Sequence, residues 1–135
     1  MDNRFKEKLN DLEKAINRLA EAISDSEQNP QISTLKDGVI QRFEFTYELC
    51  WKLMKYFLEQ EGIEEAKSPR STFREAFQYG LIVDGKAWID MLKDRNLTSH
   101  VYDEDIAEEI YEKIKGNYYN MLNDMKEILK GKDSE

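Results

Sequence analysis

The chain has 135 residues, which is the usual size of one domain, and it can bury a core without disulfides. It contains only six glycines and two prolines, while helix-favouring residues abound, so a many-stranded sandwich or barrel and a disordered chain are excluded. Its net charge of −8 argues against sequence-independent binding to nucleic acid, which needs clustered cations. We therefore expect an all-α domain with no DNA partner, in which any contact with RNA is local.

The single cysteine, Cys50, excludes an internal disulfide framework and a thiolate metal cluster. It lies in an apolar run, so we expect a small buried side chain there. The first residues lack the apolar segment of a signal peptide, and no stretch approaches the roughly 20 apolar residues of a membrane span. The sequence therefore predicts a cytoplasmic protein without a membrane partner.

Apolar residues recur every three or four positions over residues 4–27, which predicts a first helix with a narrow apolar stripe. Residues 28–31 break the pattern. A second helix is expected over about 34–60, ending at Gly62.

The second helix carries more apolar side chains than one stripe can hold, since eleven of the sixteen residues in 43–58 are apolar or aromatic. Such a helix is central in a core or buried against a second subunit. We expect both here: an inner face in the core and an outer face, around Phe45, Trp51 and Tyr56, that forms a homodimer.

Cap signals predict two shorter helices. Ser68 with Pro69 begins a third helix that closes at Gly80, and Asp84 caps a fourth over about 86–96. The side chains expected to face the core are Phe73, Ala76 and Phe77 in the third helix, and Trp88, Met91 and Leu92 in the fourth.

Asp103, followed by two more acids, begins the last long helix. Residues 1–130 therefore form one up-and-down four-helix bundle with a broken helix, and 131–135 form a frayed tail. The apolar stripe expected along the last helix is Ile106, Ile110, Ile114, Tyr118, Met121, Met125 and Ile128.

The residues that can carry chemistry lie between the fourth and last helices. Arg95 can clamp a phosphate, the only histidine, His100, can transfer protons near neutral pH, and Asn96 and Tyr102 stand beside them. The free amides of the following helix favour an anion. The alternatives are that His100 is a cap or surface residue and that Tyr102 is a packing residue.

The string Arg95-Asn96-x-x-x-His100-x-Tyr102 resembles the Arg-x4-His-x-Tyr signature of HEPN domains. The segments 40–52 and 68–77 are similar to the same subgroup, the HepT-like or nucleotidyltransferase substrate-binding proteins associated with minimal nucleotidyltransferases. The resemblance covers nearly the whole chain and implies a compact HEPN-like bundle.

The resemblance also implies a function. Similar proteins are toxins of toxin–antitoxin pairs that cut RNA without a metal across a dimer interface. A partner nucleotidyltransferase silences them by transferring AMP to the motif tyrosine, here Tyr102. Arg95, His100 and Asn96 would then be the catalytic residues, with no cofactor, and two protomers would supply two histidines and two arginines.

Two further sets of charged residues remain open to a functional or a structural interpretation. Lys67, Arg70 and Arg74 either guide RNA phosphates towards the site or pair with Glu64, Glu65 or Glu75. Glu44 and Glu48 have no recognised metal-ligand spacing and are expected to solvate a helix face or to pair with Arg42 and Lys52.

The sequence thus favours a metal-independent ribonuclease toxin that acts as a homodimer and has a nucleotidyltransferase antitoxin as its partner. The rival hypothesis, which the acidic net charge favours, is a non-catalytic subunit that presents a nucleotide or substrate to the nucleotidyltransferase. A third is a purely structural helical adaptor.

Overall fold

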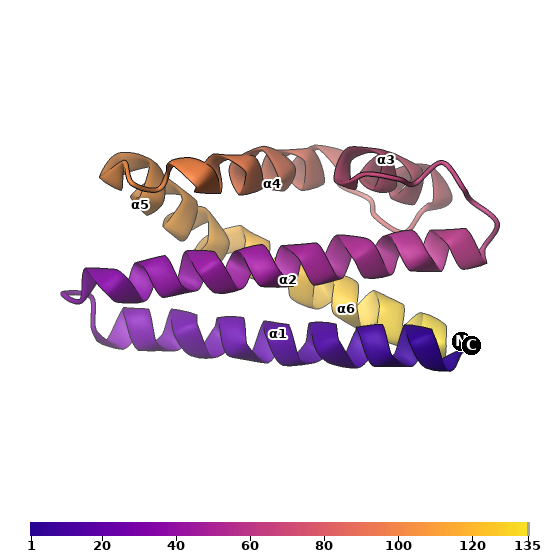
Figure 1. The fold of residues 1–135 in the computed structure, drawn as a ribbon, viewed down its shortest axis with the longest axis horizontal. Coiled ribbons are helices and arrows are strands. Elements are labelled where there is room, and N and C mark those ends of the chain that lie inside the picture. The colour runs from indigo at the N-terminus through magenta and orange to yellow at the C-terminus, as the bar shows by residue number, and fades with distance from the viewer. Residues whose placement is uncertain (135) are drawn as a thin grey trace.

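The computed structural model describes residues 1–134, which are helical throughout except for short connections (Figure 1). The expected all-α class is confirmed. In chain order the helices are α1 (Asn3–Gln28), α2 (Ser33–Gln60), α3 (Pro69–Tyr79), α4 (Gly85–Leu97), a 3₁₀ turn (Thr98–His100), α5 (Glu104–Lys113), a π-helical turn (Ile114–Tyr118) and α6 (Tyr119–Asp133).

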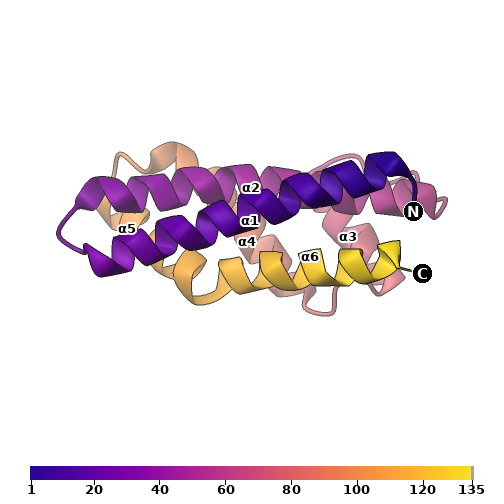
Figure 2. The same cartoon turned by 90° about the horizontal axis from the view of Figure 1, so that it is seen from below.

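The helices form a four-part bundle, as the sequence predicted. α1 and α2 run antiparallel, α5 continues through the π turn into α6 as one long rod, and α3 with α4 makes the broken fourth element (Figures 1 and 2). α2 is central because it packs against α1, α3, α5 and α6. The two chain ends meet at one end of the bundle, where the Met1 amine lies 3.4 Å from an Asp133 carboxylate oxygen.

Side-chain caps fix where the helices begin. The carboxylate of Asp84 accepts a hydrogen bond from the Ala87 amide at 3.0 Å, and Asp103 likewise caps α5. Ser68 caps α3 with Pro69 in its first turn, and α3 ends at Gly80 with a φ of 94°, a conformation that favours glycine. These four predicted boundaries are confirmed.

The core contains most of the side chains expected there, including all of those named in α4. Cys50 is buried as expected, and burial raises the pKa of its thiol. Phe77 was expected inside but is 53% exposed. The reason is that Leu81 and Ile82, just past α3, fill the core, while the Phe77 ring lies over the start of α4, 3.4 Å from where a Cβ at Gly85 would be.

The π turn changes the register of the last helix. Ile110, Ile114, Tyr118 and Met125 are buried as predicted, but Leu122 and Leu129, which were not predicted there, also enter the core. Of the residues expected inside, Met121 and Ile106 are half-buried and Ile128 is 42% exposed. A π turn contains more residues than an α turn. Side chains four positions apart, from Ile110 to Leu122, therefore stay on the side of the helix that faces the core.

The helix also ends later than predicted, at Asp133 rather than before Gly131, and residue 135 of the expected tail lies outside the described part. Within residues 1–134, no helix is both long enough and apolar enough to cross a membrane.

A buried polar contact ties α4 to the π turn. The Tyr118 hydroxyl donates a hydrogen bond to the buried Asp94 carboxylate, which also lies 3.2 Å from the Lys113 ammonium. Burial, together with Asp94, raises the pKa of Tyr118. The Tyr118 ring stacks on Phe43 of α2 with centroids 5.7 Å apart, so one side chain joins three elements.

We predict that Tyr118→Phe lowers the free energy of unfolding by about 1–3 kcal/mol, because a buried carboxylate loses a hydrogen-bond donor. Chemical denaturation measures the change. Tyr119→Phe is the matched control, since the half-buried Tyr119 makes no hydrogen bond through its hydroxyl within the described residues. Equal stability of the two variants would contradict a supporting role for the Tyr118–Asp94 contact.

Candidate functional site at the α4–α5 junction

The junction is a tight connection in which α4 ends in the 3₁₀ turn and α5 begins at the Asp103 cap. The Thr98 hydroxyl donates a hydrogen bond to the Arg95 carbonyl oxygen at 2.7 Å, and Asp103 accepts one from the Asp105 amide at 2.9 Å. With both ends of the segment held by side chains, His100 and Tyr102 lie on a short, defined loop.

Arg95 points towards α2 and is held there by two carboxylates. One guanidinium nitrogen, Nη1, lies 3.3 Å from Glu44 Oε2 and donates to the Thr98 hydroxyl at 2.9 Å. The Nε lies 3.8 Å from Glu48 Oε1 and makes no hydrogen bond. The side chain is 27% exposed at the edge of a shallow cavity of about 280 Å³, which is lined also by Glu44, Phe45 and Glu48.

His100 and Tyr102 form a second, more exposed pair. The His100 Nδ1 lies 3.2 Å from the Tyr102 hydroxyl, and the rings meet edge-on with centroids 5.8 Å apart. Tyr102 is 82% exposed, which argues against the packing role considered for it. The contact occupies one nitrogen of the imidazole and leaves Nε2 without a hydrogen-bond partner within residues 1–134.

The structure therefore separates the expected catalytic residues into two groups within one chain. Arg95 contacts α2, whereas His100 contacts Tyr102, and no direct contact joins the two groups in the described residues. Asn96 is exposed, and its side chain contacts neither group.

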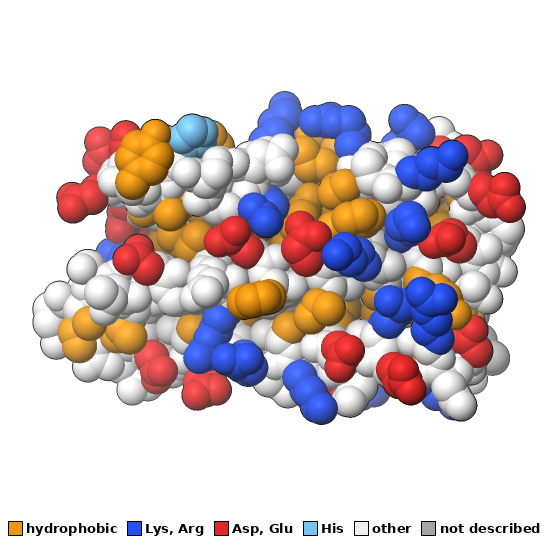
Figure 3. Space-filling view, viewed as in Figure 1, with side chains coloured by type: hydrophobic (Ala, Val, Ile, Leu, Met, Phe, Trp, Pro, Cys, Tyr) orange, Lys and Arg blue, Asp and Glu red, His pale blue; other side chains and the backbone are white. Residues whose placement is uncertain are grey.

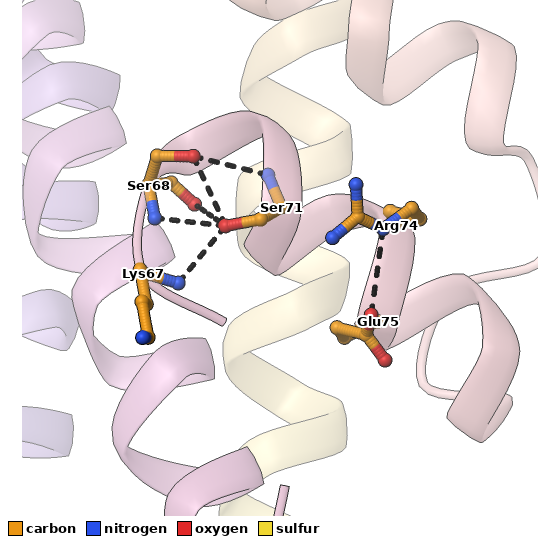
Figure 4. A network of polar contacts seen from close by, with 5 residues as sticks. All are labelled: Lys67, Ser68, Ser71, Arg74 and Glu75. Atoms are coloured by element: carbon orange, nitrogen blue, oxygen red, sulfur yellow. Dashed lines mark hydrogen bonds and ion pairs between the residues drawn. The ribbon is translucent and has the colours of Figure 1, made fainter. Parts of the chain in front are cut away.

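The basic residues Lys67, Arg70 and Arg74 lie just before α3 and along it, and Figure 4 shows Lys67 and Arg74. The Ser71 hydroxyl accepts hydrogen bonds from the Lys67 and Ser68 amides, each at 2.9 Å, which fixes the turn. Arg74 lies 3.4 Å from Glu75, so the structural pairing is confirmed for this residue. Neither Lys67 nor Arg70 makes an ion pair within the described residues.

Arg70 is nevertheless close enough to the junction to share a neighbour with it. Burial raises the pKa of Tyr47, and the positive charges of Arg95 and Arg70 both oppose that rise. The two guanidinium groups therefore act on the same buried phenol of α2. Lys67 lines a different cavity, nearer the end of α2, with Trp51 and Tyr56.

The outer face of α2 is less apolar than expected. Phe45 is 63% exposed, but Trp51 and Tyr56 are half-buried and use their polar atoms. The Trp51 indole donates to Glu48 at 3.0 Å, and the Tyr56 hydroxyl donates to Asp2 at 2.6 Å. The exposed apolar area that these three residues offer is therefore smaller than expected, and the homodimer through this face stays a prediction. Phe45 alone of these three is largely exposed.

A family model described as "Nucleotidyltransferase substrate binding protein like" matches residues 7–131. The chain belongs to this family. The resemblance inferred from Arg95, His100 and Tyr102 is confirmed at the level of the family.

Relatives and solved structures agree with this membership. The chain is 42% identical over 85 residues to the Haemophilus influenzae protein named "Probable ribonuclease HepT", which is 60% of this chain but only 58% of that protein. A Haemophilus influenzae structure described as the fold of a substrate-binding domain of a nucleotidyltransferase is 34% identical, with a TM-score of 0.80 over 90% of this chain and 98% of that one.

A more distant solved structure has the same fold. It is a tri-AMPylated HEPN toxin of Shewanella oneidensis in complex with an MNT antitoxin, 21% identical, with a TM-score of 0.74 over 97% of this chain and 99% of that one. At this identity the likeness establishes the fold alone.

Sequence reasoning missed the partners of Arg95 in this family member. The expected pair of Glu48 and Lys52 is present at 3.9 Å, but Glu44 pairs with Arg95 and not with Arg42, which donates to a backbone oxygen of α1. No local spacing links residue 44 to residue 95. A signal for the buried Asp94 did exist, because it lies three residues after Met91 on the inner side of α4.

Proposed function

We propose that the chain is a ribonuclease toxin that cleaves RNA without a metal. The observation that supports this most is that the partly exposed Arg95 and the exposed His100–Tyr102 pair lie on one short junction whose two ends are held by side-chain hydrogen bonds. The name of the relative from Haemophilus influenzae supports the same activity.

The chemistry follows from the groups available. A base removes the proton of the RNA 2′-hydroxyl, this oxygen attacks the phosphorus, and the bond to the 5′-oxygen breaks as an acid protonates that oxygen. His100 transfers protons, Arg95 binds the phosphate and stabilises its developing charge, and Asn96 orients the site. Arg70 guides the RNA backbone towards Arg95.

A homodimer supplies the second proton-transfer group, because each chain contains one histidine. Phe45 adjoins the cavity that Arg95 lines, so a twofold contact through Phe45 would bring two such cavities together. The Arg95 and His100 groups, separate within one chain, would then combine with those of the second chain.

The proposed partner is a small nucleotidyltransferase that acts as the antitoxin by modifying Tyr102. In that step the Tyr102 oxygen attacks the α-phosphorus of ATP, loses its proton and releases pyrophosphate. The exposure of Tyr102 makes the oxygen accessible, and the AMP would add charge and bulk beside His100. The acids at 103–105 would add to the repulsion of an RNA phosphate.

The second candidate function is a non-catalytic subunit that presents a nucleotide or substrate to the nucleotidyltransferase. The carboxylates of Glu44 and Glu48 favour it, because they already neutralise the only arginine of the junction. The family description favours it as well.

We predict that His100→Ala abolishes RNA cleavage and that Arg95→Ala lowers kcat/KM by about 10²–10³-fold, because charge developing on the phosphate loses its partner. Chelator should leave the wild-type rate unchanged. Lys93→Ala, an exposed cation two residues from Arg95, is the control and should keep the wild-type rate. Cleavage by pure His100→Ala protein would contradict the assignment.

We predict a dimer at micromolar concentration in sedimentation equilibrium. Phe45→Glu should yield monomers, because it puts a charge in the apolar contact, whereas Val83→Glu, at a residue that is 91% exposed, should not. A wild-type monomer would remove the composite site and with it the proposed source of the second proton-transfer group.

We predict that Tyr102→Phe keeps the nuclease activity but escapes neutralisation, whereas His100→Ala is inactive yet still accepts AMP. Intact-mass spectrometry after incubation with the nucleotidyltransferase and ATP reads the modification. Tyr79→Phe, at a tyrosine that is 42% exposed, is the control and should be modified like wild type. If Tyr102→Phe gains the AMP mass as readily as wild type, neutralisation through Tyr102 is refuted and the substrate-presenting subunit is favoured.

A further inference from the structure

A cavity of about 400 Å³ lies between the start of α1, the second half of α2 and the segment before α3. We name it the basic groove. Its wall includes Trp51 and Tyr56, and its five basic residues are Arg4, Lys8, Lys52, Lys55 and Lys67.

The lining of the groove is positively charged, whereas the chain as a whole is negatively charged. The chain has a net charge of −8, yet five cations line this one cavity with Glu59 as the single acid among them. Figure 3 shows Lys and Arg side chains gathered over the half of this face where α2 ends. A local concentration of positive charge on an acidic protein attracts an anion to that place and not to others.

Three of these cations have no carboxylate partner among the described residues. Lys55 pairs with Glu59 at 3.2 Å and Lys52 with Glu48 at 3.9 Å, whereas Arg4, Lys8 and Lys67 make no ion pair.

Two of the cations without an ion pair, Arg4 and Lys8, lie over the Tyr56 ring. The Arg4 guanidinium lies 5.1 Å and the Lys8 ammonium 5.9 Å from the ring centroid, so both turn towards the cavity. Asp2, an acid outside the groove lining, accepts a hydrogen bond from the Tyr56 hydroxyl at 2.6 Å. The ring therefore holds two cations beside the cavity, and neither makes an ion pair within the described residues.

The groove meets the candidate site at a single side chain. Glu48 lies 3.8 Å from Arg95 through Oε1, and its Oε2 accepts the Trp51 indole hydrogen at 3.0 Å and lies 3.9 Å from Lys52. Along α2, residues 48 to 55 span about 10 Å at 1.5 Å per residue. A polymer lying along α2 can thus reach the groove and Arg95 together.

Cations that follow a path beside aromatic rings are the usual means of binding single-stranded nucleic acid, whose phosphates meet the charges and whose bases meet the rings. We propose that the basic groove binds the phosphate backbone of single-stranded RNA on one side of the scissile bond and leads it to Arg95. This inference rests on the proposed ribonuclease function. It also answers how an acidic protein can hold RNA, since the contact is local.

The test is the affinity of a fluorescent 12-nucleotide RNA for the full chain carrying His100→Ala, measured by anisotropy over a range of salt. Lys8→Glu should weaken binding about tenfold and lower the salt slope by about 0.7 or more, the contribution of one single-strand phosphate contact. Lys6→Glu changes the net charge equally but lies about 200° around α1 from Lys8, so it should leave both values unchanged. Equal effects of the two variants would overturn the proposal.

A second variant and a second ligand separate the possible failures. Lys67→Gln, on a different segment, should also weaken RNA binding, by about threefold, and no effect would overturn the groove. Binding of ATP that depends on Lys8 while RNA binding does not would also overturn it, in favour of a free nucleotide. If Lys8→Glu weakens RNA binding but pure wild-type protein cleaves no RNA, the groove stands and the ribonuclease function fails.

Discussion

Asp94 and Arg95 are consecutive residues of α4 that are held from opposite sides, and the geometry of the candidate site depends on this pair. Asp94 points inward, where the Tyr118 hydroxyl and the Lys113 ammonium satisfy its buried charge. A buried carboxylate without such partners would be strongly unfavourable, so α4 is fixed against the π turn. Arg95, one residue on, must then face α2, where Glu44 and Glu48 receive it.

The ion pairs of Arg95 with Glu44 and Glu48 affect how a phosphate ligand can bind. Glu44 and Glu48 hold the guanidinium in place, but they also compete with a phosphate for its hydrogens. Since Arg95 is partly exposed, each ion pair contributes little to stability, and a dianionic or polymeric ligand that makes further contacts can displace a carboxylate. A single phosphate makes fewer contacts with the protein, so it displaces a carboxylate less readily than such a ligand does. The basic groove would supply those further contacts, and Glu48 is the residue through which the two regions meet.

Much of the fold was predictable from local chemistry. Ser68 and Asp84 begin helices because their side chains accept backbone hydrogen bonds that no helix can satisfy alone, and such signals lie in a few adjacent residues. The register beyond Tyr118 was not predictable in this way, since it follows a π turn in which Tyr118 packs against Asp94 and Phe43, residues far away in the sequence. An ideal helical period therefore assigned Ile128 to the core incorrectly.

The candidate site was predictable only in part. The motif residues are close in sequence, so the junction could be found from their spacing. The contacts of Arg95 with Glu44 and of Arg4 with Tyr56 join residues about fifty positions apart, and only the packing of the bundle brings them together. For the same reason the aromatic excess of α2 predicted a broad apolar face, whereas Trp51 and Tyr56 turn their polar atoms to carboxylates.

We propose that RNA cleavage by this chain proceeds by attack of the 2′-hydroxyl, using its own side chains. The most direct measurement is the chemistry of the ends produced when pure protein is incubated with an RNA in the presence of chelator. We predict fragments that end in a 2′,3′-cyclic phosphate and begin with a 5′-hydroxyl, and no cleavage at a position carrying a 2′-deoxy sugar. Fragments with 3′-hydroxyl ends, or cleavage that appears only when a divalent cation is added, would contradict it.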